Sequence, residues 1–104
     1  MNEMGKLMRE VAMIGAGMSK FGAFPDKNSR DLWGEAFINC LASIDKNFEI
    51  KDIEALYLGN YSSDLFESQG HLAPMCAELA GITPKPASRT EDACASSGIA
   101  IREG

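Results

Sequence analysis

The sequence has little of what membrane-spanning and nucleic-acid-binding proteins need. No apolar run approaches the roughly 20 residues that cross a bilayer, so we expect no membrane association. Basic residues are outnumbered by acidic ones, 10 to 15, and the net charge is −5. A basic surface for nucleic acid is therefore absent, and we expect no nucleic-acid partner.

Cysteine and histidine are also scarce. The three cysteines, Cys40, Cys76 and Cys94, are widely spaced and odd in number, and the first residues lack the apolar region of a secretory signal. These features favour reduced thiols in a cytoplasmic protein. His71, the one histidine, has no metal-ligand spacing to the cysteines, so a zinc site is not expected. His71 could pair with Cys94, but we interpret it as a surface or supporting residue.

What the chain does contain suits one ordinary α/β domain. Its 104 residues are 45% hydrophobic and 24% charged, which is enough for a modest core. Residues 1–10 mix both charges without periodicity and are expected to form a flexible leader, with residues 11–104 as the domain. We expect strands at residues 11–14, 53–60 and 86–90, alternating with helices at residues 29–44, 69–80 and 95–101. This alternation predicts a mainly parallel sheet with right-handed crossovers.

Glycines follow the first expected strand. Gly15 and Gly17 suggest a dinucleotide-binding loop, but the third glycine of that fingerprint would fall at Lys20. A turn between packed elements is the better interpretation. In the next helix we expect Ser29 as the N-cap.

The first helix and the segment after the second strand complete this outline. Trp33 and Cys40 lie on the apolar stripe of the helix, so both are expected in the core. Asn60 lies where a parallel strand would end, which makes it either a site residue or a turn residue with left-handed backbone. A polar loop is expected at residues 61–67. In the helix that follows, at residues 69–80, Leu72, Met75, Cys76 and Leu79 are expected inward and Gly81 as its C-cap. Because Pro74 lies inside this range, the helix either starts close to it or bends there.

Cys94 is the main candidate for chemistry. It lies in Glu91-Asp92-Ala93-Cys94-Ala95-Ser96-Ser97-Gly98, between an expected strand and an expected helix. Unpaired N–H groups and the helix dipole at such a junction favour the nucleophilic thiolate, whereas Glu91 and Asp92 favour the neutral thiol. Small neighbours leave room for a substrate. The alternative is that Cys94 is simply a small buried hydrophobic residue.

This stretch resembles the nucleophile segment of the thiolase family, approximately Asn-x-x-Cys-x-Ser-Gly. Three other segments resemble the family in the same order: residues 11–22 its opening strand and turn, residues 56–60 its second strand, and residues 68–70 the start of the next helix. The similarity is greatest to the archaeal and sterol-carrier-protein-like thiolases. It implies a fold of two stacked α/β halves that usually dimerises.

The resemblance also implies a mechanism. Cys94 would carry an acyl group taken from a coenzyme A thioester, during condensation to a 3-ketoacyl-CoA or its thiolytic cleavage. The Cys94 N–H would belong to an oxyanion hole. Acyl-CoA is then a substrate, and no bound cofactor is expected.

Two departures from the family qualify this interpretation. Glu91 stands where most members have asparagine, and Ser97 where they have glycine. The resemblance also places an activating histidine and a second cysteine beyond the first quarter of the family's length. We therefore expect the chain to be incomplete and inactive alone, and to work with the remainder of the thiolase or as a homo-oligomer. The alternative is a non-catalytic interaction module that pairs its sheet edge or a helix with a partner.

Overall fold

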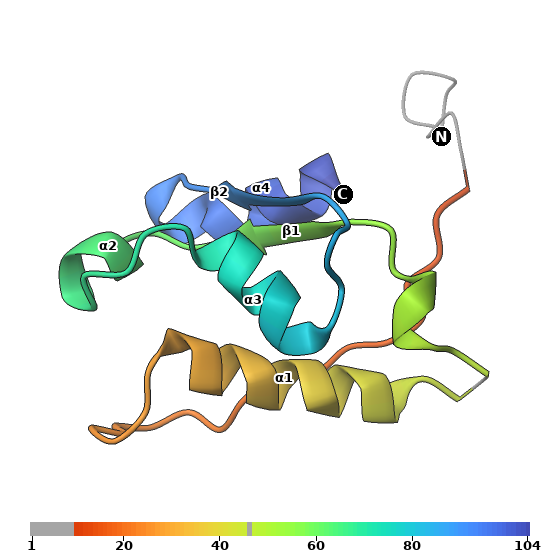
Figure 1. The fold of residues 1–104 in the computed structure, drawn as a ribbon, viewed down its shortest axis with the longest axis horizontal. Coiled ribbons are helices and arrows are strands. Elements are labelled where there is room, and N and C mark those ends of the chain that lie inside the picture. The colour runs from red at the N-terminus through yellow and green to blue at the C-terminus, as the bar shows by residue number, and fades with distance from the viewer. Residues whose placement is uncertain (1–9, 46) are drawn as a thin grey trace, which may run out of the picture.

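The computed structural model describes residues 10–45 and 47–104, so nearly all of the expected leader lies outside the described residues. The described chain is a mixed helix and strand structure (Figure 1). Its elements are α1 (Ser29–Ser43), η2 (Ile50–Asp52), β1 (Leu56–Gly59), α2 (Ser63–Phe66), α3 (Leu72–Ala80), β2 (Ala87–Thr90), η3 (Ala93–Ala95) and α4 (Ser96–Glu103).

A two-stranded parallel sheet lies at the centre, which confirms the predicted α/β class. β1 pairs with β2 in a register that sets Leu56 opposite Ala87 and Gly59 opposite Thr90. Helices α3 and α4 lie on opposite sides of the strands, and α1 lies beyond α3 (Figure 1). Leu58 is buried with α3, while the Tyr57 side chain lies near the end of α4 and is 42% exposed. The alternation predicted for this strand is confirmed.

Side chains of α3 form most of the core. The buried residues of α3 are Leu72, Ala73, Cys76, Ala77 and Ala80. The prediction that Leu79 points inward is wrong, because it is 57% exposed. The inward face consists mainly of alanines, so the helix can lie close to the sheet. Leu58 and Ile82 extend this core on either side.

The ends of α3 follow from its sequence. The helix begins at Leu72 rather than Gln69, so Pro74 falls in the first turn, where a missing N–H costs no intrahelical hydrogen bond. Gly81 has φ +76°, and its N–H donates to the Glu78 carbonyl at 3.1 Å. It is the predicted C-cap.

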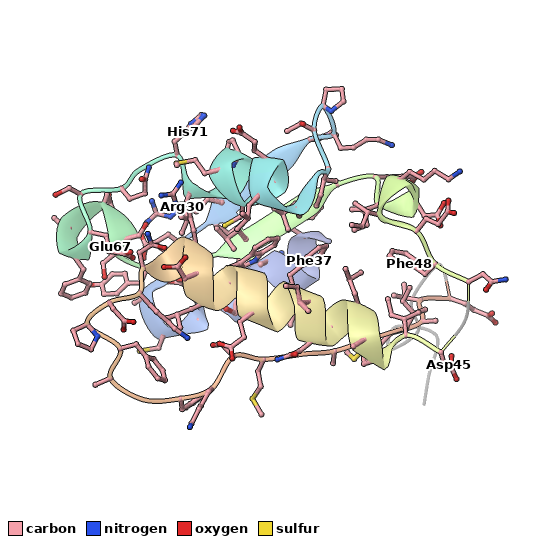
Figure 2. The ribbon with its side chains drawn as sticks, turned by 60° about the horizontal axis from the view of Figure 1, so that its bottom comes forward. Arg30, Phe37, Asp45, Phe48, Glu67 and His71 are labelled. Carbon is pink, nitrogen blue, oxygen red and sulfur yellow. The ribbon has the colours of Figure 1, made fainter. Side chains whose placement is uncertain are left out.

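Helix α1 begins one residue after its cap, which is Asn28 and not the predicted Ser29. Asn28 Oδ1 accepts from the Asp31 N–H, and Asp31 Oδ2 accepts from the Asn28 N–H, both at 3.0 Å. This reciprocal pair satisfies two donors at the helix start. Trp33 and Phe37 stack with ring centroids 5.0 Å apart and pack against the core, as expected for Trp33. Figure 2 shows Phe37 on the side of α1 that faces α3.

The strand predicted at residues 11–14 is not present. This segment has no regular secondary structure, and Val11 and Met13 are at least 80% exposed. The backbone that follows lies along α1 instead: the Ala16 N–H donates to Ser43 Oγ, and Asn39 Nδ2 donates to the Met18 carbonyl, both at 2.9 Å. A strand requires a neighbouring strand for its hydrogen bonds, and among the described residues the sheet consists of β1 and β2.

The loop predicted at residues 61–67 contains the short helix α2. Asn60 starts it, because its Oδ1 accepts from the Ser63 N–H at 3.0 Å. At its other end the Glu67 carboxylate accepts from the N–H of Ser29 at 2.8 Å and from the Ser29 hydroxyl, which joins α2 to the start of α1. Within residues 10–45 and 47–104, no helix combines the length and hydropathy that a membrane crossing requires.

Candidate functional site

The two strands end side by side, and the chain leaves both at the same edge of the sheet. The Asn60 N–H donates to the Thr90 carbonyl at 3.1 Å, one residue beyond β1. Arg89 of β2 connects the strand to the segment that follows β1. Its Nε donates to the Asn60 carbonyl at 3.2 Å and its Nη2 to the Tyr61 carbonyl at 2.8 Å. Substrates of open α/β sheets usually bind at this end of the strands.

Cys94 lies at this edge, in the turn between β2 and α4. The sequence predicted a thiol at a strand-to-helix junction, and η3 and α4 confirm that position. The thiol is free and exposed, so the alternative of a small buried hydrophobic residue is wrong. Cys76, by contrast, is fully buried, and burial raises the pKa of its thiol to about 11, against a smaller lowering by Arg30.

Hydrogen bonds from Ser96 hold the turn around Cys94. Ser96 is buried, and its hydroxyl accepts from the Asp92 N–H at 2.9 Å and donates to the Ala93 carbonyl at 2.7 Å. The hydroxyl of Thr90 donates to the Ser96 carbonyl at 3.1 Å. Strand, turn and helix are thus connected through one side chain.

The residue before the thiol has an unusual backbone. Ala93 has φ +47°, a left-handed conformation that residues with a Cβ seldom adopt. Within the described residues, the N–H of Cys94 makes no hydrogen bond. An exposed thiol and an unpaired N–H therefore belong to the same residue.

The two acidic neighbours differ in their contacts. Glu91 Oε2 accepts from the Ala93 N–H at 2.7 Å, so this carboxylate supports the turn. Asp92 contributes its backbone, since its carbonyl accepts from the Ala95 N–H at 2.8 Å. Glu91 is thus one of the groups that hold Ala93 in its left-handed conformation.

Comparison with known proteins identifies the family. No protein-family model matches the chain. The chain is 43% identical over 97 residues to an acetyl-CoA acetyltransferase of Methanothermobacter thermautotrophicus, and 44% identical over 96 residues to one of Methanocaldococcus jannaschii. These matches cover 93% and 92% of the chain. The chain belongs to the thiolase family. It spans about a quarter of the length of these relatives, 25% and 24%.

Two further predicted residues of this thiolase chain do not contact the thiol. His71 is the N-cap of α3 with φ +60°, and its side chain is exposed and points away from the rest of the molecule (Figure 2). No hydrogen bond joins it to Cys94 within the described residues, as its interpretation as a surface residue predicts. The Asn60 side chain accepts from the N–H of Ser63, the first residue of α2, and the Asn60 backbone is not left-handed.

Sequence reasoning missed Gly59, which sets the position of α4 next to the turn that contains Cys94. A Cβ at Gly59 would lie 2.5 Å from Ser97 Cα and 2.6 Å from the Ser96 carbonyl carbon. Glycine at the end of a strand is the sequence signal for such a close backbone approach. Because β1 and α4 touch here through backbone atoms, Gly59 sets the height of α4 above the sheet.

Within the described residues, neither a possible metal cluster nor the hollow along α1 and α3 lies at Cys94. Within the part of the chain that the structure describes, no three His, Cys, Asp or Glu side chains gather into a possible metal site. A hollow of about 580 Å³ lies elsewhere, along α1 and α3, and its lining includes Trp33, Phe37 and Leu79. The thiolase thiol is instead at an open surface.

Proposed function

We propose that the chain forms part of a thiolase-type acyl-CoA acyltransferase in which Cys94 carries the acyl group. The observation that carries this proposal is an exposed thiol with an unpaired N–H at a strand-to-helix turn. It occurs in a chain that is 43–44% identical to two proteins named acetyl-CoA acetyltransferase. The substrate is a coenzyme A thioester, and the setting is cytoplasmic.

The proposed first step is transfer of an acyl group to sulfur. The Cys94 thiolate attacks the thioester carbonyl, a C–Sγ bond forms, the bond from carbon to the coenzyme A sulfur breaks, and coenzyme A leaves as a thiolate that takes up a proton. Negative charge develops on the carbonyl oxygen during this step. The Cys94 N–H is free to donate to that oxygen, which is how an oxyanion hole stabilises a tetrahedral intermediate.

The second step uses a second acyl-CoA or free coenzyme A. In condensation, a base takes a proton from the α-carbon of a second acyl-CoA, the resulting carbanion forms a C–C bond to the acyl carbon on Cys94, and the C–Sγ bond breaks, which releases a 3-ketoacyl-CoA and the Cys94 thiolate. In thiolysis the reaction runs in reverse: Cys94 takes the acyl group from a 3-ketoacyl-CoA, and free coenzyme A then takes it from Cys94. Either direction requires a base and an acid near the thiol, and His71 makes no hydrogen bond to it within the described residues. We therefore propose that turnover requires the other three quarters of the family's length, in one polypeptide or in trans.

The test is mass spectrometry of the folded chain after incubation with acetyl-CoA or acetoacetyl-CoA. We expect an acetyl adduct on the peptide that contains Cys94, and none on Cys40 or Cys76. The control variant, Cys94→Ala, should take up no acetyl group. An adduct on another cysteine, or no adduct on a chain whose circular dichroism shows it folded, would contradict the proposal.

A second candidate function is a non-catalytic interaction module, because the described chain leaves much apolar surface uncovered. Phe21, Leu65 and Phe66 are all more than 80% exposed. Within residues 10–45 and 47–104, each strand of the sheet also has one edge without a strand partner. This candidate predicts an oligomer or a partner complex whose formation is unaffected by Cys94→Ala. The catalytic proposal predicts that the same variant abolishes acylation.

A further inference from the structure

Ser96 lies where the turn before Cys94 meets the ends of β1 and β2. Ser96 is 4% exposed, so water cannot readily replace its hydrogen bonds. Its oxygen accepts from the Asp92 N–H and donates to the Ala93 carbonyl, and so links the two residues that precede Cys94. Both capacities of one hydroxyl are thus used on the turn that carries the thiol.

We infer that Ser96 is the positioning residue for the nucleophile: its hydroxyl holds the turn in which the Cys94 N–H stays unpaired and available to an oxyanion. The inference rests on the proposed function, because it assigns a role to that N–H in the proposed acyl transfer. Ser96 itself touches neither thiol nor substrate in this role and acts through the backbone of Asp92 and Ala93.

The left-handed backbone of Ala93 is the reason a hydroxyl is needed. An alanine at φ +47° is disfavoured unless its surroundings hold it there. The Ala93 carbonyl accepts from both the hydroxyl and the backbone N–H of Ser96, and the Ala93 N–H donates to Glu91, so both peptide groups of this residue are held. Without the Ser96 hydroxyl, the Ala93 carbonyl loses one of its two donors and the Asp92 N–H loses its acceptor, so the turn is held less firmly and the direction of the Cys94 N–H changes.

Ser96 can hold the turn because it is itself held by the sheet. Its carbonyl accepts from the Thr90 hydroxyl at the end of β2. Its backbone also lies against Gly59 at the end of β1, where a Cβ would come within 2.6 Å of it. The hydroxyl therefore ties the turn to a part of the backbone that both strands fix.

The neighbouring hydroxyl provides a matched control. Ser97 is exposed, and its side chain makes no hydrogen bond within the described residues. Ser96→Ala and Ser97→Ala remove the same atom from adjacent positions on α4, one buried in the turn and one at the surface. Ser96→Thr keeps the hydroxyl and serves as the rescue variant.

The experiment compares two reactions of Cys94 in the full 104-residue chain. Acylation by acetyl-CoA develops an oxyanion, whereas alkylation by iodoacetamide does not, so their ratio reports on the N–H rather than on thiol exposure. We expect Ser96→Ala to lower the acylation rate by roughly tenfold or more while alkylation changes much less, in line with the loss of one oxyanion donor. Ser97→Ala should behave as the unmodified chain, and Ser96→Thr should recover acylation.

Equal loss of both reactions in Ser96→Ala, or the same ratio in Ser97→Ala, would overturn the inference. If the unmodified chain takes up no acetyl group, the proposed function fails, and the inference is tested separately by the amide resonances of Ala93 and Cys94. Ser96→Ala should shift both resonances while Ser97→Ala leaves them in place. Unchanged resonances in Ser96→Ala would overturn it.

Discussion

At the residue scale, burial separates the three cysteines into different chemical environments. Cys76 is fully buried against the sheet, Cys40 is half-buried on α1, and Cys94 is exposed in the turn before α4. The nucleophile requires access to a substrate as well as a thiolate, and Cys94 alone of the three is exposed. The sequence predicted Cys40 in the core, and the structure shows it half-buried, so that prediction is confirmed in part.

Cys76 gives a prediction about stability at high pH. Its thiol pKa is about 11 in the folded chain against an ordinary 9.0, so the unfolded chain loses this proton first as the pH rises. The stability that the neutral thiol contributes is present below pH 9 and is lost between pH 9 and pH 11, by up to about 2–3 kcal/mol. Urea unfolding of the chain and of Cys76→Ala at pH 8, 9, 10 and 11 measures it. An equal pH dependence in the two chains would contradict it.

At the scale of elements, the site depends on how α4 lies on the sheet. α4 begins directly after the turn that contains Cys94, and β1 meets it at Gly59. β2 meets the start of the same helix through Thr90 and Ser96. Both contacts involve the first turn of α4. They therefore fix the end of the helix that lies next to Cys94 and not its C-terminal end.

Two glycines allow a matched test of this contact. Gly59→Ala should destabilise the chain by about 1–3 kcal/mol and slow the acylation of Cys94, because the new methyl meets backbone atoms of Ser96 and Ser97. Gly98 lies on α4 with no atom within 4 Å of an added Cβ. Gly98→Ala should therefore be neutral or stabilising by up to about 1 kcal/mol, since alanine is the better helix former. Thermal unfolding followed by circular dichroism compares them, and a Gly59→Ala chain as stable as Gly98→Ala would refute the contact.

At the scale of the whole molecule, the chain is less compact than its length predicts. It exposes 8185 Å² of surface, whereas a folded monomer of 11.2 kDa exposes about 5700 Å². Its radius of gyration is 15.0 Å, against about 13 Å for a compact domain of this length. The difference in area is comparable to an obligate protein–protein interface. A further polypeptide would therefore find a large surface to cover, and exposed hydrophobic side chains such as Phe21, Leu65 and Phe66 are part of it.

This surface predicts association of the chain. Ile101 on α4 is 77% exposed and Leu79 on α3 is 57% exposed, on opposite sides of the sheet. We expect sedimentation velocity at micromolar concentration to show species larger than a monomer, in the unmodified chain and equally in Cys94→Ala. Ile101→Glu and Leu79→Glu, one variant for each side, should identify the side that associates by shifting the distribution towards monomer. A monomer at all concentrations would contradict this prediction.

The sequence by itself determined the local elements and the place of the thiol. The pattern of apolar residues predicted β1, α1 and α3, and small residues around Cys94 predicted the junction that carries it, because these signals act over a few neighbouring residues. Only the tertiary structure decided the rest. Residues 11–14 do not pair with β1, because the backbone that follows them is hydrogen-bonded along α1 at Ala16 and Met18, and Leu79 faces outward because alanines face the sheet. Likewise, Gly59 and Ser96 gain their roles from backbone atoms that strand pairing and helix packing bring beside them.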